Sequence, residues 1–182
     1  GLVGLKPSRG RVSGAPMYAE VTGLAMTEPL ARTVRDAAAF LDVLASHGAG
    51  DLASLPAPQT SFLDACERTP TTLRIARFIE PVIADTAVHP SAVAAWQEAS
   101  DLLRDLGHTV EDVAVPIPRE AVATFETCWA VLTALTPAPP GREELLRPLT
   151  RWLSDQGHAI SGPEFALALG ELRRIGARAV EA

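Results

Sequence analysis

The sequence predicts an α/β protein, because segments with strand character alternate with segments that carry the apolar spacing of helices. Residues 73–79 and 109–115 have strand character, and residues 90–106 between them have helical spacing. A strand, a helix and a strand at this distance predict a βαβ unit with parallel strands and a right-handed crossover. The 182 residues are 47% hydrophobic and 21% charged, so the chain has enough apolar material for a core.

Residues 1–8 predict a buried strand, with Leu2, Val3 and Leu5 apolar and Pro7 ending the ladder. A glycine-containing loop follows over residues 8–27. Natural termini are usually polar, so the apolar beginning at Gly1 leads us to expect a chain cut from a longer one. The end of the chain inside a helical pattern supports the same expectation.

Thr33 and Asp36 form a capping-box pattern that predicts the start of a helix. An apolar stripe follows, and Gly48 is expected to stop the helix. The stripe consists of Val34, Ala37, Ala38, Leu41 and Leu44. Residues 61–67 predict a short helix.

Pro90 suits the first turn of the helix over residues 90–106, and Gly107 is expected to end it. Its predicted buried stripe is Val93, Trp96, Ala99, Leu103 and Leu106. Downstream, helices are expected over residues 120–135, over residues 143–155 with a kink or restart at Pro148, and from the capping box Ser161–Glu164 onward. The last helix should face inward with Phe165, Leu169, Leu172 and Gly176 or Ile175.

The composition argues against several classes of function. A formal charge of −6 and a pI near 5.2 repel phosphate backbones, so neither nucleic acid nor an anionic membrane is an expected partner. No apolar run approaches the ~20 residues of a membrane span, and residues 1–11 lack a signal peptide. Cys66 and Cys128 form no CxxC pair and fit a reducing compartment as buried spectator thiols. We expect a cytoplasmic protein.

No catalytic site is evident from the residues themselves. The chain has no GxSxG elbow, and His47, His89, His108 and His158 show no metal spacing and lie near helix ends, where a structural role is favoured. A Ser–Lys mechanism needs a lysine that can be neutral, and arginine cannot replace it. Lys6, the only lysine, and Ser8 form the one candidate pair. A structural role for Lys6 is the favoured interpretation, and neither a metal nor a cofactor is expected.

Two stretches resemble the amidase signature family: residues 1–13, GLVGLKPSRGRVS, and residues 29–38, PLARTVRDAA. The segments LRIA at 73–76 and LGHTVE at 106–111 match the family's downstream pattern. Glu28 departs from it, because the family usually has glycine before this proline. The resemblance implies part of a mixed β-sheet covered by helices, and thus an incomplete amidase domain. It divides the chain into the end of the conserved core at 1–46, the βαβ region at 47–116 and a mostly helical variable region at 117–182.

Members of this family hydrolyse amides with a serine nucleophile, a second serine in a cis peptide and a lysine. By resemblance all three lie upstream of residue 1, so no catalytic residue is assigned in this chain and Lys6 inherits no such role. The resemblance implies a fragment of an enzyme that converts a carboxamide to an acid and ammonia or an amine, without a cofactor. Phe125 and Trp129, one turn apart, are the candidates for substrate binding, although a core stripe also explains them.

The alternative hypothesis is a non-catalytic relative that acts as a binding or subunit-interaction module. A truncated product without a role of its own is a third interpretation. Missing sheet strands would expose apolar surface and strand edges, so we expect the isolated chain to aggregate or to form a homodimer.

Overall fold

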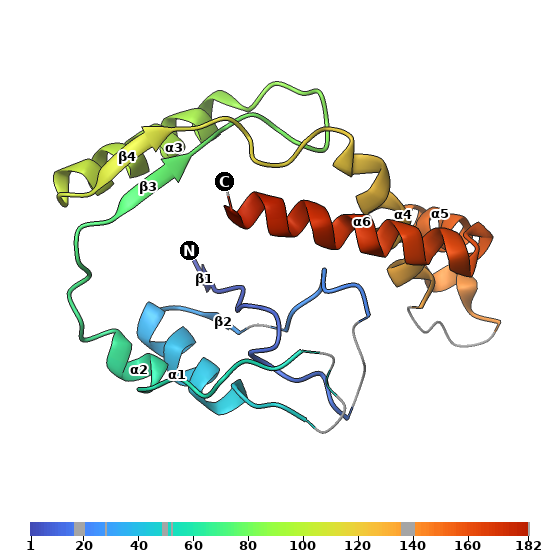
Figure 1. Cartoon of the computed structure of the whole chain (residues 1–182), viewed down its shortest axis with the longest axis horizontal. Helices are drawn as coiled ribbons and strands as arrows, with labels where there is room; N and C mark the ends of the chain where they lie inside the picture. The colour runs from blue at the N-terminus through green and yellow to red at the C-terminus, as the bar shows by residue number, and fades with distance from the viewer. Residues whose placement is uncertain (17–20, 28, 49–50, 52, 136–140, 182) are drawn as a thin grey trace. The chain divides into compact units, whose positions relative to one another are not determined.

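The computed structural model describes residues 1–16, 21–27, 29–48, 51, 53–135 and 141–181 (Figure 1). It is an α/β structure, with two small sheets and several helices, as the sequence predicts. Its contacts divide the chain into two compact units, Gly1–Thr71 and Thr72–Ala182. In the described part of the chain, no helix combines the length and the apolar character needed to cross a membrane. Residue 28 and the break at 136–140 lie outside the described residues.

The first unit contains a minimal antiparallel sheet. Strand β1 (Val3–Gly4) pairs with β2 (Leu30–Ala31), with Val3 opposite Ala31. The prediction of a buried strand at residues 1–8 is wrong, because Leu2 is 67% exposed and Leu5 is also exposed. The pairing extends over two residues with a single neighbouring strand, and Leu2 and Leu5 lie just outside it.

Helix α1 (Val34–Leu44) begins as its capping residue predicts. The Thr33 hydroxyl accepts a hydrogen bond of 3.0 Å from the Asp36 amide, and Ala37, Ala38 and Leu41 are buried. The prediction that Gly48 ends the helix is wrong. The helix ends at Leu44, because Ala45 is extended and forms a bridge with Val12.

Gly48 instead belongs to a loop organised by Asp51. One Asp51 oxygen accepts from the Ser13 hydroxyl at 2.9 Å, and the other accepts from the Gly48 amide at 2.6 Å. These two donors, the Gly48 amide first, lower the pKa of the Asp51 carboxyl. The ionised carboxylate therefore joins two loops that are far apart in the sequence.

The short helix α2 (Phe62–Ala65) is capped twice, which explains how four residues hold a helical turn. The Ser61 hydroxyl accepts from the Asp64 amide at 2.9 Å. The Asp42 carboxylate, on α1, accepts from the amides of Phe62 and Leu63 at 2.7 and 3.0 Å. A negative charge at a helix N-terminus also favours the helix dipole.

The second unit contains the predicted βαβ element. Strand β3 (Arg74–Arg77) and strand β4 (Thr109–Asp112) are parallel, with Arg74 opposite Thr109 and Arg77 opposite Asp112. Helix α3 (Pro90–Asp105) connects them, begins with Pro90 in its first turn and lies along the strand pair (Figure 1).

Gly107 ends α3 as predicted. Its φ of 91° is accessible to glycine at little cost. The Gly107 amide donates to the Arg104 carbonyl at 2.9 Å, and the His108 amide donates to the Leu103 carbonyl at 3.1 Å, the pattern of a Schellman motif.

The buried face of α3 differs from the predicted stripe. Ser100 is its buried residue, while Ala99 and Leu106 are exposed. Ser100 can be buried because its hydroxyl donates to the Trp96 carbonyl one turn earlier, at 2.7 Å. The predicted stripe is right at Trp96 and Leu103, which are half-buried, and wrong at Val93, Ala99 and Leu106, because the packed face includes Ser100 in place of Ala99.

Three helices complete the second unit. Helix α4 (Ala121–Ala134) packs against α5 (Pro148–Ala159) and α6 (Gly162–Glu181), with the short 3-10 turn η1 (Glu143–Leu145) before α5 (Figure 1). The restart at Pro148 is confirmed. The Ser161 cap is also confirmed, since its hydroxyl accepts from the Glu164 amide, and Ile175 is buried on α6.

Gly157 sets the distance between α4 and α5. A Cβ atom at this position would lie 2.2 Å from the carbonyl oxygen of Ala130 and 2.8 Å from the Cβ of Ala134. No side chain fits there without moving one helix away from the other. Glycine is intrinsically unfavourable within a helix by roughly 1 kcal/mol, so its presence reflects the close contact.

We expect Gly157→Ala to destabilise the protein by about 1–3 kcal/mol, because the added methyl group overpacks the helix contact. For a chain of this size, the melting temperature should fall by ~2–4 °C per kcal/mol. The matched control is Gly176→Ala on α6, where an added Cβ atom would meet no other part of the structure within 4 Å. That substitution should raise the melting temperature slightly, since alanine favours the helix. A Gly157→Ala melting temperature equal to or above that of the parent protein would contradict the interpretation.

Candidate functional site

The predicted substrate-binding pair, Phe125 and Trp129, forms a compact aromatic surface on α4. The two rings are stacked, with centroids 5.5 Å apart and an angle of 25° between their planes. Phe125 is half-buried, and Trp129 is 40% exposed. Aromatic rings one helical turn apart can contact an apolar group without changing the backbone.

The surroundings of this pair contribute few polar groups. The hydroxyls of Thr127 and Thr133 donate to the carbonyls of Ala123 and Trp129, each one turn earlier on the same helix. Cys128 is fully buried on the packed side of α4, and burial raises the pKa of its thiol. The aromatic surface can therefore bind an apolar group, but no activated nucleophile or base among the described residues is placed beside that group.

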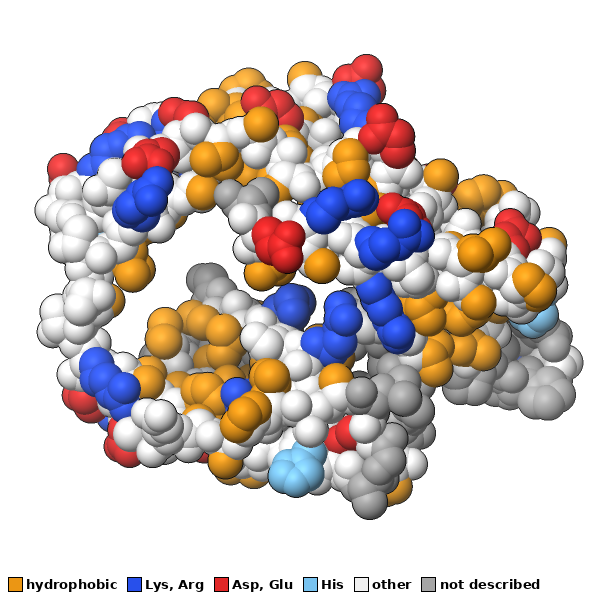
Figure 2. Space-filling model, viewed as in Figure 1, with side chains coloured by type: hydrophobic (Ala, Val, Ile, Leu, Met, Phe, Trp, Pro, Cys, Tyr) orange, Lys and Arg blue, Asp and Glu red, His pale blue; other side chains and the backbone are white. Residues whose placement is uncertain are grey.

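Further apolar side chains reach the surface of the same helical unit. Figure 2 shows them on the visible face where α4, α5 and α6 lie. Trp152 on α5 is 57% exposed, and Leu149 is exposed one turn before it. Exposure alone therefore does not distinguish Trp129 from the other exposed apolar side chains of these helices. The stacking of Trp129 with Phe125 distinguishes it.

The Lys6 and Ser8 pair is not assembled for catalysis. The Lys6 ammonium donates to the carbonyl of the adjacent Pro7 at 2.9 Å, and the Ser8 carbonyl accepts from the Arg11 amide at 3.0 Å. Within the described residues, no hydrogen bond joins the lysine to the Ser8 hydroxyl. This geometry agrees with the structural role that the sequence favoured for Lys6.

Three of the histidines make local contacts that explain their positions. The His89 ring caps the N-terminus of α3 by accepting from the Ser91 amide, His108 accepts from the Leu73 amide, and the His158 ring lies 2.8 Å from the Ser154 carbonyl. Across the residues that the structure describes, no group of three or more His, Cys, Asp or Glu side chains is placed to hold a metal ion.

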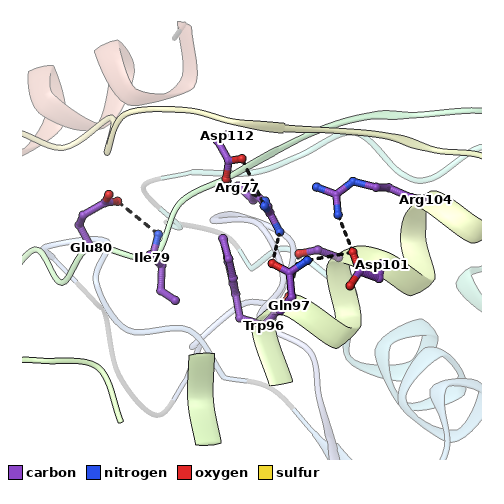
Figure 3. Close-up of polar contacts among 9 residues, drawn as sticks. Arg77, Ile79, Glu80, Trp96, Gln97, Asp101, Arg104 and Asp112 are labelled. Carbon is purple, nitrogen blue, oxygen red and sulfur yellow. Dashed lines mark hydrogen bonds and ion pairs between the residues drawn. The ribbon is translucent and has the colours of Figure 1, made fainter. Parts of the chain in front are cut away.

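Among the described residues, Arg77 is the centre of an extended polar cluster, which the sequence analysis did not single out (Figure 3). Its guanidinium donates to both oxygens of Asp112, at 2.9 and 3.2 Å, and to Gln97 at 3.4 Å. It also lies over the Trp96 ring, 4.0 Å from the centroid. Only 13% of the Arg77 side chain is exposed. The cluster thus ties both strands to α3.

The cluster continues along α3 without enclosing a ligand site. Gln97 donates to Asp101 at 2.9 Å, and Arg104 donates to the same oxygen at 2.7 Å (Figure 3). Each charged group is thus matched by a neighbour, which indicates a structural role. The sequence alone does not mark this pair, because Arg77 and Asp112 lie opposite each other only once the register of β3 and β4 is known.

Comparisons with known proteins identify the protein family to which the chain belongs. The model of the amidase family matches residues 1–138, and the chain belongs to this family. The chain is 34% identical over 187 residues to the 6-aminohexanoate-cyclic-dimer hydrolase of Paenarthrobacter ureafaciens, covering 95% of this chain and 38% of that protein. It is 34% identical over 155 residues to a putative amidase of Synechocystis, covering 85% of this chain and 29% of that one.

A solved structure of a 6-aminohexanoate cyclic dimer hydrolase with its substrate has the same fold. Its TM-score is 0.78 at 26% identity, and the match covers 98% of this chain and 40% of that one. The chain thus spans about two fifths of the length of the Paenarthrobacter hydrolase and of the protein in the solved structure, and 29% of the Synechocystis protein.

We expect Arg77→Lys to destabilise the second unit by about 1–2 kcal/mol, because lysine keeps the charge but loses the two-pronged bond to Asp112 and the stacking on Trp96. The matched control is Arg74→Lys in the same strand. Arg74 makes one contact, with Glu111, and its side chain is 82% exposed, so that change should stay within ~0.5 kcal/mol. Urea unfolding of both variants measures the difference. Equal losses of unfolding free energy in the two variants would contradict a stabilising role for the two bonds to Asp112 and the stacking on Trp96.

Proposed function

We propose that the protein is an amidase that hydrolyses the C–N bond of a carboxamide to a carboxylic acid and ammonia or an amine. The observation that carries this proposal is the family match over residues 1–138, together with 34% identity to a 6-aminohexanoate-cyclic-dimer hydrolase along 95% of the chain. Such a reaction combines general-base activation of a serine with stabilisation of the oxyanion that forms in the tetrahedral intermediate.

The serine, the cis serine and the lysine of this mechanism are proposed to lie outside the 182 residues. Two observations support this placement. The single lysine of the chain, Lys6, donates to a backbone carbonyl next to it and not to the Ser8 hydroxyl. The arginines cannot replace it, because a guanidinium does not give up its proton in proteins. The region 1–46 would then be the end of the conserved core, 47–116 the βαβ region and 117–182 the variable region.

The proposed substrate is a small amide with an apolar portion. The stacked pair Phe125 and Trp129 supports this, because it offers apolar aromatic surface with few polar groups around it. A cyclic amide of the kind named for the Paenarthrobacter relative is the first compound to test. We also propose a cytoplasmic location, supported by two free cysteines of which one is buried.

We expect this 182-residue chain to release no ammonia or amine from a panel of simple carboxamides. A form extended upstream, to the natural start of its reading frame, should be active. The reason is that general-base activation of a serine is worth orders of magnitude in rate and needs a group that this chain does not place. Activity in the short chain would contradict the proposed location of the catalytic residues and direct attention to Ser8 and Lys6. Inactivity in both forms would favour the non-catalytic module.

In the active form, Trp129→Ala should raise KM for a bulky apolar amide about 10- to 100-fold, because ~1–3 kcal/mol of apolar contact is lost. The KM for acetamide should not change. The matched control is Trp152→Ala on α5, which removes another exposed tryptophan and should leave both values unchanged. Equal effects of Trp129→Ala on the two substrates would remove Trp129 from the proposed pocket.

A further inference from the structure

We propose that the peptide bond between Arg68 and Thr69 is where a trypsin-like protease, one that cuts after a basic residue, first cleaves the folded chain. The proposal does not depend on the proposed amide hydrolysis. In this cleavage, water adds across the C–N bond, so that Arg68 ends in a carboxylate and Thr69 begins with an amino group. The bond lies close to the boundary between the two compact units, Gly1–Thr71 and Thr72–Ala182.

The residues that follow Arg68 form a connection without hydrogen bonds. Residues 69–72 lead from α2 to β3 (Figure 1) and are all exposed, and none of them forms a hydrogen bond within the described part of the chain. Backbone hydrogen bonds end at the Arg68 amide, which donates to the Ala65 carbonyl at 3.2 Å, and resume at the Leu73 amide, which donates to His108. A protease binds its substrate as an extended segment, and here it can do so without unfolding either unit.

Arg68 itself can leave its position at little cost. Its guanidinium donates to the Thr60 hydroxyl, in a contact that is exposed to solvent. The preceding residue, Glu67, pairs with Arg35, and both of these side chains are more than half exposed. Exposed polar and ionic contacts of this kind contribute little to stability. Pro70 does not protect the bond, since proline blocks such proteases when it directly follows the basic residue.

Proline or regular secondary structure protects most of the other basic residues. Lys6 and Arg147 are each followed directly by proline. Cleavage within a helix or a strand requires several backbone hydrogen bonds to break together, which makes it rare in a folded protein. The arginines that lie in helices or in β3 are Arg35, Arg74, Arg77, Arg104, Arg151, Arg173, Arg174 and Arg178.

The first three arginines of the chain adjoin a turn, a strand or a cap. Arg9 and Arg11 belong to a turn in which the Arg11 amide donates to the Ser8 carbonyl at 3.0 Å. Arg32 lies directly between β2 and the Thr33 cap of α1. Binding any of these segments in an extended form therefore requires the local structure to open first.

Arg119 and Arg142 precede helical turns. The carbonyl of each accepts from the amide three residues further on, at 3.1 and 3.0 Å. The Arg68 carbonyl, by contrast, accepts no hydrogen bond from the described residues. In the part of the chain that the structure describes, a protease that cuts after basic residues thus meets its least constrained bond at Arg68.

The test is brief digestion of the full chain with trypsin at low concentration, followed by mass spectrometry. We expect residues 1–68 and 69–182 to appear as the first pair of fragments. Arg68→Gln should slow the loss of the intact chain at least tenfold, because the remaining sites need local unfolding. Thr69→Pro should do the same while it keeps the arginine, since proline then follows Arg68 directly. The matched control is Arg142→Gln, at another exposed arginine, which should be digested at the rate of the parent chain.

Circular dichroism of each variant establishes that it is folded. The proposal is overturned by a first cut after any other basic residue, or by Arg68→Gln and Thr69→Pro chains that are lost at the parent rate. It is also overturned when many fragments appear together from the start. That result would mean that the whole chain unfolds before it is cut and that the connection after Arg68 has no special susceptibility.

Discussion

Gly157 lies against the backbone of Ala130 with no room for a side chain, and the arrangement of α4 and α5 depends on this contact. Because the two helices approach so closely, Cys128 and Ala130 are buried between elements that are otherwise short and amphipathic. The packed side of α4 is fixed in this way, and Phe125 and Trp129 are left on its accessible side. A glycine thus determines which residues of α4 remain available for binding, although it takes no part in binding itself.

The second unit also depends on a polar constraint at its other end. A parallel pair of four-residue strands has few ladder hydrogen bonds, and Arg77 adds contacts to Asp112, Gln97 and Trp96 from one side chain. In the first unit, Asp42 and Asp51 act in a related way, because Asp42 accepts from the Phe62 amide and Asp51 accepts from the Ser13 hydroxyl, each in a segment distant in the sequence. With small sheets and few fully buried side chains, charged groups that join segments distant in the sequence carry much of the organisation.

Features encoded in a few adjacent residues could be predicted from the sequence. The Thr33 cap, the Gly107 terminator and the restart at Pro148 each depend on residues within one turn, and all three are confirmed. Features that depend on a distant partner could not be predicted. The end of α1 is set by the bridge between Ala45 and Val12, and the role of Gly157 is set by a helix more than twenty residues away. The same holds for the candidate site. The spacing of Phe125 and Trp129 can be seen in the sequence, whereas the contacts of Arg77 depend on how β3 pairs with β4.

The two cysteines report on different parts of the chain. Cys66 follows α2 in the first unit and is half-buried, whereas Cys128 is fully buried in α4. Alkylating reagents attack the thiolate, and burial both shields Cys128 and raises its pKa. Cys66 should therefore be modified in the folded protein, while Cys128 should react when α4, α5 and α6 separate. The rate of the second alkylation then measures how often this helical bundle opens, without any engineered label.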